Sequence, residues 1–155
     1  MSSLGLLLVI ALLLISGARE QAASPSNGYE RRLDPIELTS TWSYFYFEQG
    51  GSLSSPTFFV NAKVGDAIQM TDLFCAGDLF TLLLDIPQLN LHLSFNSSTV
   101  PTSCSPYVTD PWSAFISGTF SRLSYTFPQA LYANMTVRAA ISPYGNGAGA
   151  IRKFL

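Results

Sequence analysis

The sequence predicts an all-β protein: an antiparallel β-sandwich of the jelly-roll kind with about eight strands. Three observations support this prediction. After residue 35, short segments of alternating apolar and polar residues are separated by turn residues. No segment carries apolar residues at helical spacing over three turns. The 11 glycines, 9 prolines and charged fraction of 12% argue against a coiled coil, a helical repeat or a charged disordered chain. A closed barrel is the main alternative arrangement.

The first predicted strands are rich in aromatic and branched residues. Segment 41–48 is aromatic at both alternating positions, which is typical of a strand with two covered faces or of a strand lining a groove. Within it, we expect Trp42 and Tyr46 to fill the core, because a sandwich needs large residues between its sheets. Further strands are expected at 57–60, 67–71 and 79–84, the last with Phe80, Leu82 and Leu84 on one face.

The later segments alternate more regularly. In segment 89–95, the residues expected to point inward are Leu89, Leu91, Leu93 and Phe95. In segment 132–141, they are Met135, Val137, Ala139 and Ile141. Two further strands are expected at 120–127 and 148–154. Most of the predicted strands follow their predecessors at short spacing, and no helix is expected between them, which favours an antiparallel arrangement.

The amino terminus predicts a secretory signal peptide. Residues 4–15 are almost all apolar, and as a helix they would rise about 18 Å, less than the roughly 30 Å of bilayer hydrocarbon. Small residues follow at Ser16 and Ala18, as at a signal-peptide cleavage site, although no Lys or Arg precedes the apolar run. Cleavage after Ala23 and a buried core helix are the alternatives. We therefore expect a signal peptide at 1–18, a flexible lead-in at 19–35 and a β-sandwich domain at 36–155, secreted and without a membrane span in the mature protein.

Export would expose the chain to oxidising conditions. Cys75 and Cys104 are the only cysteines, so a disulfide between them is the favoured interpretation, ahead of free thiols or a metal site. Asn96 and Asn134 each begin an N-x-S/T triplet and are predicted glycosylation sites. In their strands, Asn134 would face outward and Asn96 would fall in the turn that follows.

Residues 71–80 carry the pattern T-D-x-F-C-x-G-D-x-F. This run resembles a group of small secreted β-rich proteins of fungi and other microbial eukaryotes. Further features in the same order are Cys104, Asp110-Pro111, and the stretches 117–127 and 132–137. The resemblance covers roughly residues 57–155 and departs at Asp85-Ile86-Pro87, where the group usually has a D-N-G turn. It implies a secreted β fold and carries no known activity.

Four aspartates are candidate site residues: Asp72, Asp78, Asp85 and Asp110. Aspartates often cap turns by accepting hydrogen bonds from nearby backbone N–H groups, and this is the simplest interpretation. Alternatively, the four could bind Ca²⁺, which takes six to eight oxygens, if the disulfide draws their loops together. The C-x-x-D order at 75–78 is also similar to that of CUB domains, jelly rolls of which some bind calcium. A third possibility is a pair of carboxylates for glycoside hydrolysis, separated by about 5–9.5 Å, although no spacing in the sequence points to it. No other cofactor is expected.

Other chemistries find little support. His92 is the only histidine, and its place on the outward face favours a surface residue over a general base. The sequence contains no G-x-S-x-G, H-E-x-x-H or Walker motif. Its eight basic residues are scattered and its net charge is −2, which argues against nucleic acid as a partner.

The predicted function is therefore that of a secreted, non-enzymatic binding or cell-surface module. Its ligand would be a carbohydrate or another extracellular molecule, because exposed aromatic rings stack on flat apolar surfaces. The candidate ligand-binding residues are Trp112, Asp110, Asp72 and Asp78. Trp112 is expected in a loop that follows Asp110-Pro111. The alternative is a structural or protein-interaction protein that meets a protein partner through an exposed apolar strand face. A glycoside hydrolase is the remote third possibility.

Overall fold

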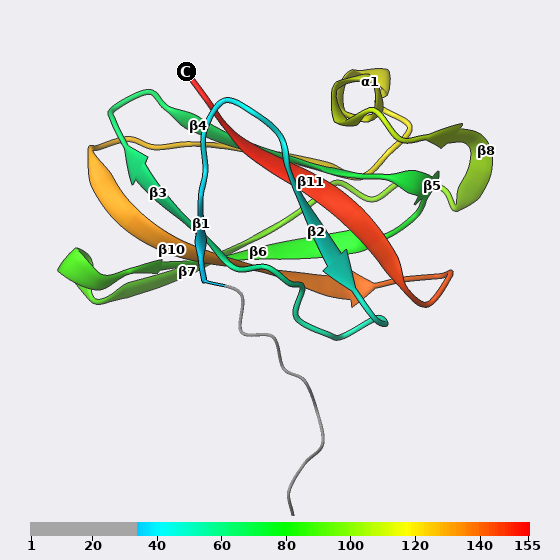
Figure 1. Ribbon diagram of the computed structural model, residues 1–155, viewed down its shortest axis with the longest axis horizontal. Helices are drawn as coiled ribbons and strands as arrows, with labels where there is room; N and C mark the ends of the chain where they lie inside the picture. Colours follow the sequence, from blue (N-terminus) through cyan, green and yellow to red (C-terminus); the bar gives the residue numbers. More distant parts are fainter. Residues whose placement is uncertain (1–33) are drawn as a thin grey trace, which may run out of the picture. The chain divides into compact units, whose positions relative to one another are not determined.

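A computed structural model describes residues 34–155 and confirms the all-β class: two β-sheets pack face to face (Figure 1). The strands of the five-stranded sheet, in spatial order, are β1 (Ile36–Glu37), β3 (Phe58–Ala62), β10 (Leu131–Ile141), β6 (Leu79–Ile86) and β7 (Leu91–Asn96). Those of the four-stranded sheet are β2 (Ser43–Phe47), β11 (Gly147–Phe154), β4 (Ala67–Asp72) and β9 (Arg122–Thr126). All neighbours in both sheets are antiparallel except β1 and β3. The predicted signal peptide at 1–18 and almost all of the lead-in at 19–35 lie outside the described residues.

The remaining elements are short. β5 (Phe74–Ala76) and β8 (Ser103–Val108) form a two-stranded sheet, and the Cys75–Cys104 disulfide joins them, as predicted. A 3₁₀ turn, η1 (Pro87–Leu89), links β6 to β7, and one α-helix, α1 (Pro111–Ser117), precedes β9. In the part of the chain from residue 34 onward, no helix is long and apolar enough to cross a membrane.

The core lies between the two sheets and follows the predicted alternation along β6. Phe80, Leu82 and Leu84 point inward and are almost completely buried. They pack in one cluster with Phe45 and Phe47 of β2. Rings at such positions bury large apolar areas and dominate the energetics of a core.

In β2 the alternation has the opposite phase to the one expected. Phe45 and Phe47 are buried, whereas Tyr46 is 58% exposed, so its assignment to the core was wrong; Trp42 is half-buried. The reason lies in β11, where Gly147 and Gly149 have no side chain and the Phe47 and Phe45 rings lie against their backbone. Any side chain at these glycines would clash with the rings.

Two further deviations arise at the ends of the five-stranded sheet. Leu89 lies in η1 and Leu91 begins β7, the edge strand; both are exposed rather than inward-facing. Ile141 was expected in the core but is 56% exposed, because the pairing of β10 with β6 shifts register after Ala139. Asn96 is the last residue of β7 rather than part of the turn that follows.

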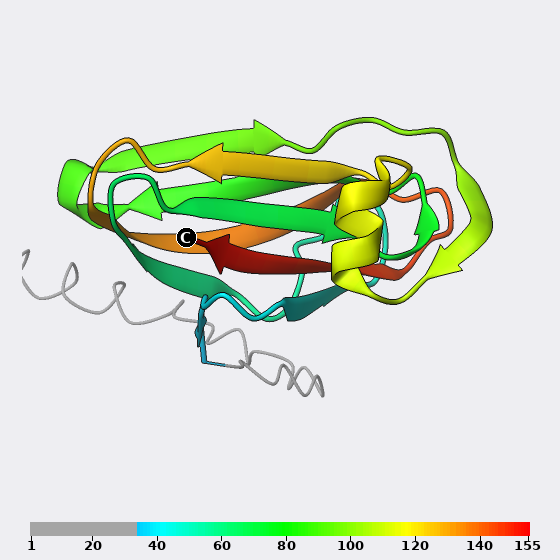
Figure 2. The ribbon, with the colours of Figure 1, turned by 90° about the horizontal axis from the view of Figure 1, so that it is seen from above.

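A second apolar cluster lies under α1 and the β5–β8 pair. Its buried members are Leu73, Ala76, Ala114, Phe120 and Ala150. Figure 2 shows α1 lying across the four-stranded sheet near one end of the sandwich. The outer face of that sheet is therefore covered at this end and open beyond it.

Candidate functional site

The structure separates the four predicted aspartates into three places. Asp72 and Asp78 lie together near one end of the sandwich and are 0% and 3% exposed. Asp85 lies on the outer face of the five-stranded sheet and pairs with His92, whose Nδ1 is 3.1 Å from the Asp85 carboxylate. Asp110 precedes α1. The residues predicted to bind a ligand or calcium together are thus not brought to one point.

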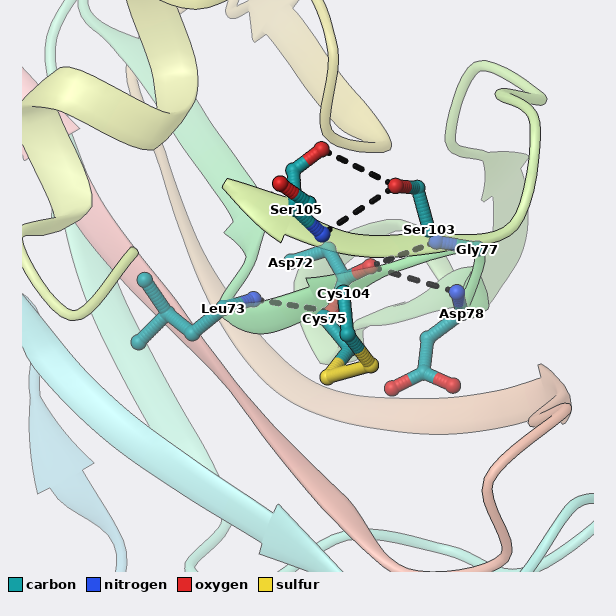
Figure 3. The surroundings of a disulfide bond; sticks show 8 residues. All are labelled: Asp72, Leu73, Cys75, Gly77, Asp78, Ser103, Cys104 and Ser105. Atoms are coloured by element: carbon teal, nitrogen blue, oxygen red, sulfur yellow. Dashed lines mark hydrogen bonds between the residues drawn. A yellow bond between two sulfur atoms is a disulfide. The ribbon is translucent and has the colours of Figure 1, made fainter. Parts of the chain in front are cut away.

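Asp72 organises the chain around the disulfide. Its Oδ1 accepts a hydrogen bond from the backbone N–H of Leu73 at 2.8 Å, and its Oδ2 accepts from those of Gly77 and Asp78 at 3.2 Å each. Figure 3 shows these N–H groups directed at the carboxylate beside the Cys75–Cys104 bridge. Gly77 has a φ of +126°, a conformation that L side chains rarely adopt. This is the predicted turn-capping role, carried out in the interior rather than at the surface.

The two buried carboxyls, Asp72 and Asp78, cannot easily both be ionised; we call them the acid pair. Burial and, to a smaller extent, the nearby charge of Asp78 together raise the pKa of Asp72 to about 8. Burial also raises the pKa of Asp78. The Oδ1 atom of Asp78 has no hydrogen-bond partner among the residues that the structure describes. We therefore expect the acid pair to hold one proton at neutral pH.

The acid pair does not form a recognisable metal or hydrolase centre. Within residues 34–155, no three or more His, Cys, Asp or Glu side chains lie close enough together to hold a metal ion. The oxygens of Asp72 already accept three N–H hydrogen bonds, which makes them poorer ligands for calcium. Since both carboxyls are buried, neither faces solvent as the acids of a glycosidase cleft do.

Asp110 caps the helix that carries Trp112. Its carboxylate accepts a hydrogen bond from the Ser113 N–H at 2.7 Å, Pro111 occupies the first turn and Gly118 ends the helix with a φ of +71°. The side chain and backbone N–H of Ser113 hold the pKa of Asp110 below its usual value. The prediction of a loop around Trp112 missed this helix, because seven residues are too few for a three-turn stripe; the Asp-Pro and Gly118 signals could have located it.

Trp112 belongs to a group of side chains from β4, α1, β11 and the residue that precedes β2, which we call the Trp112 cluster. Its members are Trp42, Gln69, Trp112, Phe115, Arg152 and Phe154. The guanidinium carbon of Arg152 lies 4.5 Å from the ring centroid of Trp42 and 4.9 Å from that of Trp112. The Phe154 ring lies 5.2 Å away. Cations at such distances are attracted by the negative faces of aromatic rings.

The sheet register explains how Arg152 reaches the two indoles. Arg152 of β11 is paired with Gln69 of β4, so both side chains stand on the same face of the four-stranded sheet. Its Nε and Nη2 donate hydrogen bonds to Oε1 of Gln69 at 3.0 and 2.7 Å. Trp112 stacks on Phe115 of the same helix, with centroids 6.2 Å apart and rings inclined by 13°.

The Trp112 cluster reaches solvent on the outer face of the four-stranded sheet. Trp112 is 45% exposed, and Phe154 is exposed beside it. Tyr44 and Tyr46 pair with Ala150 and Ala148 of β11, which point to the same face of the sheet as Arg152. Both tyrosines therefore lie on that face, and both are exposed. Aromatic surface therefore continues along β2 away from α1. The sequence predicted Trp112 but not Arg152, since nothing local in β11 indicates that this arginine meets Trp42, just before β2, and Trp112 of α1.

A second feature is a hollow on the opposite sheet. It has a volume of about 470 Å³ and is lined by residues that include Leu83, Asp85, His92, Ser94, Asn134 and Thr136. The Oδ1 atom of Asn134 accepts a hydrogen bond from the Tyr132 hydroxyl, and that of Asn96 accepts one from the Thr81 hydroxyl. Asn134 is half-buried and Asn96 is exposed. Glycosylation at either asparagine stays a prediction.

No protein-family model matches this sequence, and no curated protein matches it significantly. The Trp112 cluster is therefore the feature of the molecule from which a function is inferred.

Proposed function

We propose that this protein is a secreted, non-enzymatic carbohydrate-binding module that binds its ligand at the Trp112 cluster. The observation that carries the proposal is the exposed indole of Trp112, fixed against Phe115 and Arg152 and continued by Tyr44 and Tyr46. Flat aromatic faces stack on the apolar faces of sugar rings. Because contacts with Phe115 and Arg152 hold Trp112 in place while part of its indole stays exposed, little side-chain entropy would be lost on binding.

The proposed roles of the aspartates follow from their positions. Asp110 would act by holding α1, and with it Trp112, in place through the N-cap hydrogen bond. Asp72 and Asp78 would act through the fold alone, because they are buried. Their hydrogen bonds fix the segment that includes Leu73, whose side chain lies in the apolar cluster under α1.

A binding assay on immobilised polysaccharides tests the proposal. Trp112→Ala should weaken retention at least about tenfold, as expected for an aromatic side chain that dominates a binding surface. Tyr132→Ala is a matched control, because it removes an aromatic ring from the opposite sheet. Failure of the wild-type protein to bind any of a broad set of glycans would refute the proposal. So would equal binding by the Trp112→Ala variant.

Secretion is part of the same proposal. It is supported by the apolar run at 4–15 and by the disulfide, a bond that persists in oxidising compartments. Expression of the full chain in a eukaryotic secretory host should place the protein in the medium. Amino-terminal sequencing of that product should begin at residue 19, or at residue 24 if the second cleavage site is used. Retention of the intact chain in the cytosol would argue against export.

A protein partner is the second candidate, and the same surface favours it. Tyr46, Ile116 and Phe154 are large, apolar and exposed on or beside the four-stranded sheet. Such residues are typical of the centre of protein interfaces. This alternative predicts that a protein ligand is captured by the wild type and lost in Trp112→Ala, while no glycan is retained.

A further inference from the structure

The cationic group of the Trp112 cluster has no counter-ion in the described part of the chain. The ion pairs among residues 34–155 are His92–Asp85 and Lys153–Asp66. Arg152 takes part in neither, and both of its hydrogen bonds end on the neutral amide oxygen of Gln69. Burial lowers the pKa of Arg152, which reflects partial removal of its charge from water. A nearby anion would offset that cost.

The hydrogen bonds of Arg152 leave one edge of its guanidinium available. A guanidinium has five N–H donors in a planar fork. Gln69 accepts a hydrogen bond from the Nε–H group and another from one N–H group of Nη2. The two N–H groups of Nη1 and the other N–H group of Nη2 therefore have no partner among the described residues. These groups form the end-on edge of the fork, whose spacing matches the two oxygens of a carboxylate.

The side chains around Arg152 fix the direction of this edge. The rings of Trp42, Trp112 and Phe154 lie around the guanidinium carbon at 4.5 to 5.2 Å, and Gln69 holds the Nε side. A planar fork that is held in this way loses little freedom when it binds an anion. The indole of Trp112 lies beside the fork and is partly exposed.

We propose that the ligand of the Trp112 cluster is an acidic sugar chain, in which a uronate carboxylate binds the end-on edge of Arg152 while a sugar ring packs against the exposed part of the Trp112 indole. This inference rests on the proposed carbohydrate binding and narrows it to one class. Arg152 is then the residue that determines specificity, and Trp112 supplies apolar contact that a neutral sugar would share. No bond is made or broken on binding.

The test compares one polymer in two forms. Polygalacturonate and its fully methyl-esterified form share a backbone but differ in charge, so binding to the wild-type protein isolates the carboxylate. We expect the esterified polymer to bind at least about tenfold more weakly, the loss that corresponds to one charge-assisted hydrogen-bond pair. Affinity for polygalacturonate should also fall as salt is raised, because the interaction is ionic.

Variants assign the effect to Arg152. Arg152→Gln should abolish the preference for the acid form, and Arg152→Lys should restore it only in part, because an ammonium has no planar fork. Arg138→Gln removes the same charge from an exposed site on β10 of the other sheet and should change nothing. Thermal unfolding identifies any variant that fails to fold. The comparison of the acid and ester polymers on the wild-type protein tests the acidic class even if every variant of Arg152 fails to fold.

The outcomes separate this inference from the proposed function. Equal binding of the acid and ester forms, with loss of both in Trp112→Ala, overturns the acidic class and leaves carbohydrate binding intact. Binding to a sulfated polysaccharide but not to polygalacturonate also overturns it, because the anion would then not be a carboxylate. Absence of binding to any polysaccharide overturns both proposals.

Discussion

The acid pair and the Trp112 cluster answer the same physical problem in opposite ways. Each holds a charged group with no opposite charge beside it among the described residues. In the acid pair, burial is almost complete, and the charge is reduced by a proton and by three backbone N–H groups. In the Trp112 cluster, the guanidinium keeps its charge and meets aromatic faces and an amide oxygen. The first arrangement is shut inside the fold, whereas the second is partly exposed and leaves N–H donors without a partner among the described residues.

We propose on this basis that the acid pair serves the fold and the Trp112 cluster serves binding. A buried carboxyl can lose its charge because its pKa responds to the environment, whereas arginine stays protonated at any physiological pH. A site that must attract an anion from solvent therefore needs the arginine. We expect pH to change the stability that the acid pair contributes, and salt to change ligand affinity at the Trp112 cluster.

The largest expected effect is the pH dependence of stability caused by the acid pair. The pKa of Asp72 is about 8 in the folded protein and about 4 in the unfolded chain, so between these values the folded state binds more protons. Stability should therefore fall as pH rises from about 4 to 8, by on the order of 3–5 kcal/mol. Urea unfolding at pH 5 and pH 8 measures the difference.

Asp78→Asn provides the control for this prediction. The amide keeps the shape of the side chain and removes the second negative charge, so the slope of stability against pH should become smaller. The N-cap of Asp110 does not interfere, because its lowered pKa acts below this pH range. If the wild type unfolds at the same urea concentration at both pH values, the acid pair does not share a proton and the contrast with the Trp112 cluster disappears.

The disulfide is the next largest expected effect, and it concerns both regions. Cys75 and Cys104 are 29 residues apart in the sequence, so replacing both by Ala should lower the free energy of unfolding by roughly 3–4 kcal/mol. The bridge joins β5 to β8 beside Asp72, and Ala76 of β5 lies in the apolar cluster under α1. Trp112 fluorescence should therefore shift in the double variant even under conditions where it stays folded. An unchanged emission spectrum would mean that the Trp112 cluster is held independently of the bridge.

Removing Arg152 should have a smaller effect on stability. Arg152→Met keeps an apolar stem against Trp42 and Trp112 but loses the cation–π contacts, which are worth about 1–2 kcal/mol together at a partly exposed site. The loss should be the same at pH 5 and pH 8, since arginine does not titrate in this range. A loss that grows with pH would couple Arg152 to the acid pair and contradict the separation of the two regions.

The sequence was informative where a pattern is local. The alternation along β6 identified its buried face, and the presence of only two cysteines pointed to their bridge. The phase of β2 could not be predicted, because both faces are aromatic and the choice depends on Gly147 and Gly149 of the neighbouring strand. The prediction that Ile141 points into the core was wrong for a similar reason, because a register shift between two strands cannot be recognised in the sequence of either strand alone.

The candidate site shows the same limit. Trp112 and the aspartates could be selected by residue type, but the sequence could not predict how deeply each of them is buried. Asp72 and Asp78 resemble loop ligands in the sequence, and only the packing of β4 and β6 shows that they lie inside. Arg152 meets Trp42 and Trp112 through the pairing of β11 with its neighbours and the docking of α1. A cluster assembled from such distant segments has no spacing that could be recognised in advance.

The smallest expected effect concerns the cap of α1. Asp110→Ala removes the acceptor for the Ser113 N–H, so the first turn of the helix should fray and Trp112 should lose part of its fixed position. Because the pKa of Asp110 is lowered in the folded protein, the cap stabilises α1 above about pH 4 and is lost as the carboxyl becomes protonated. Wild type and variant should therefore differ at pH 7, and the difference should shrink as the pH falls below about 4. Polysaccharide affinity at pH 7 should fall less than in Trp112→Ala, since the indole itself remains. A loss as large as that of Trp112→Ala would instead place Asp110 in direct contact with the ligand, in agreement with its selection from the sequence.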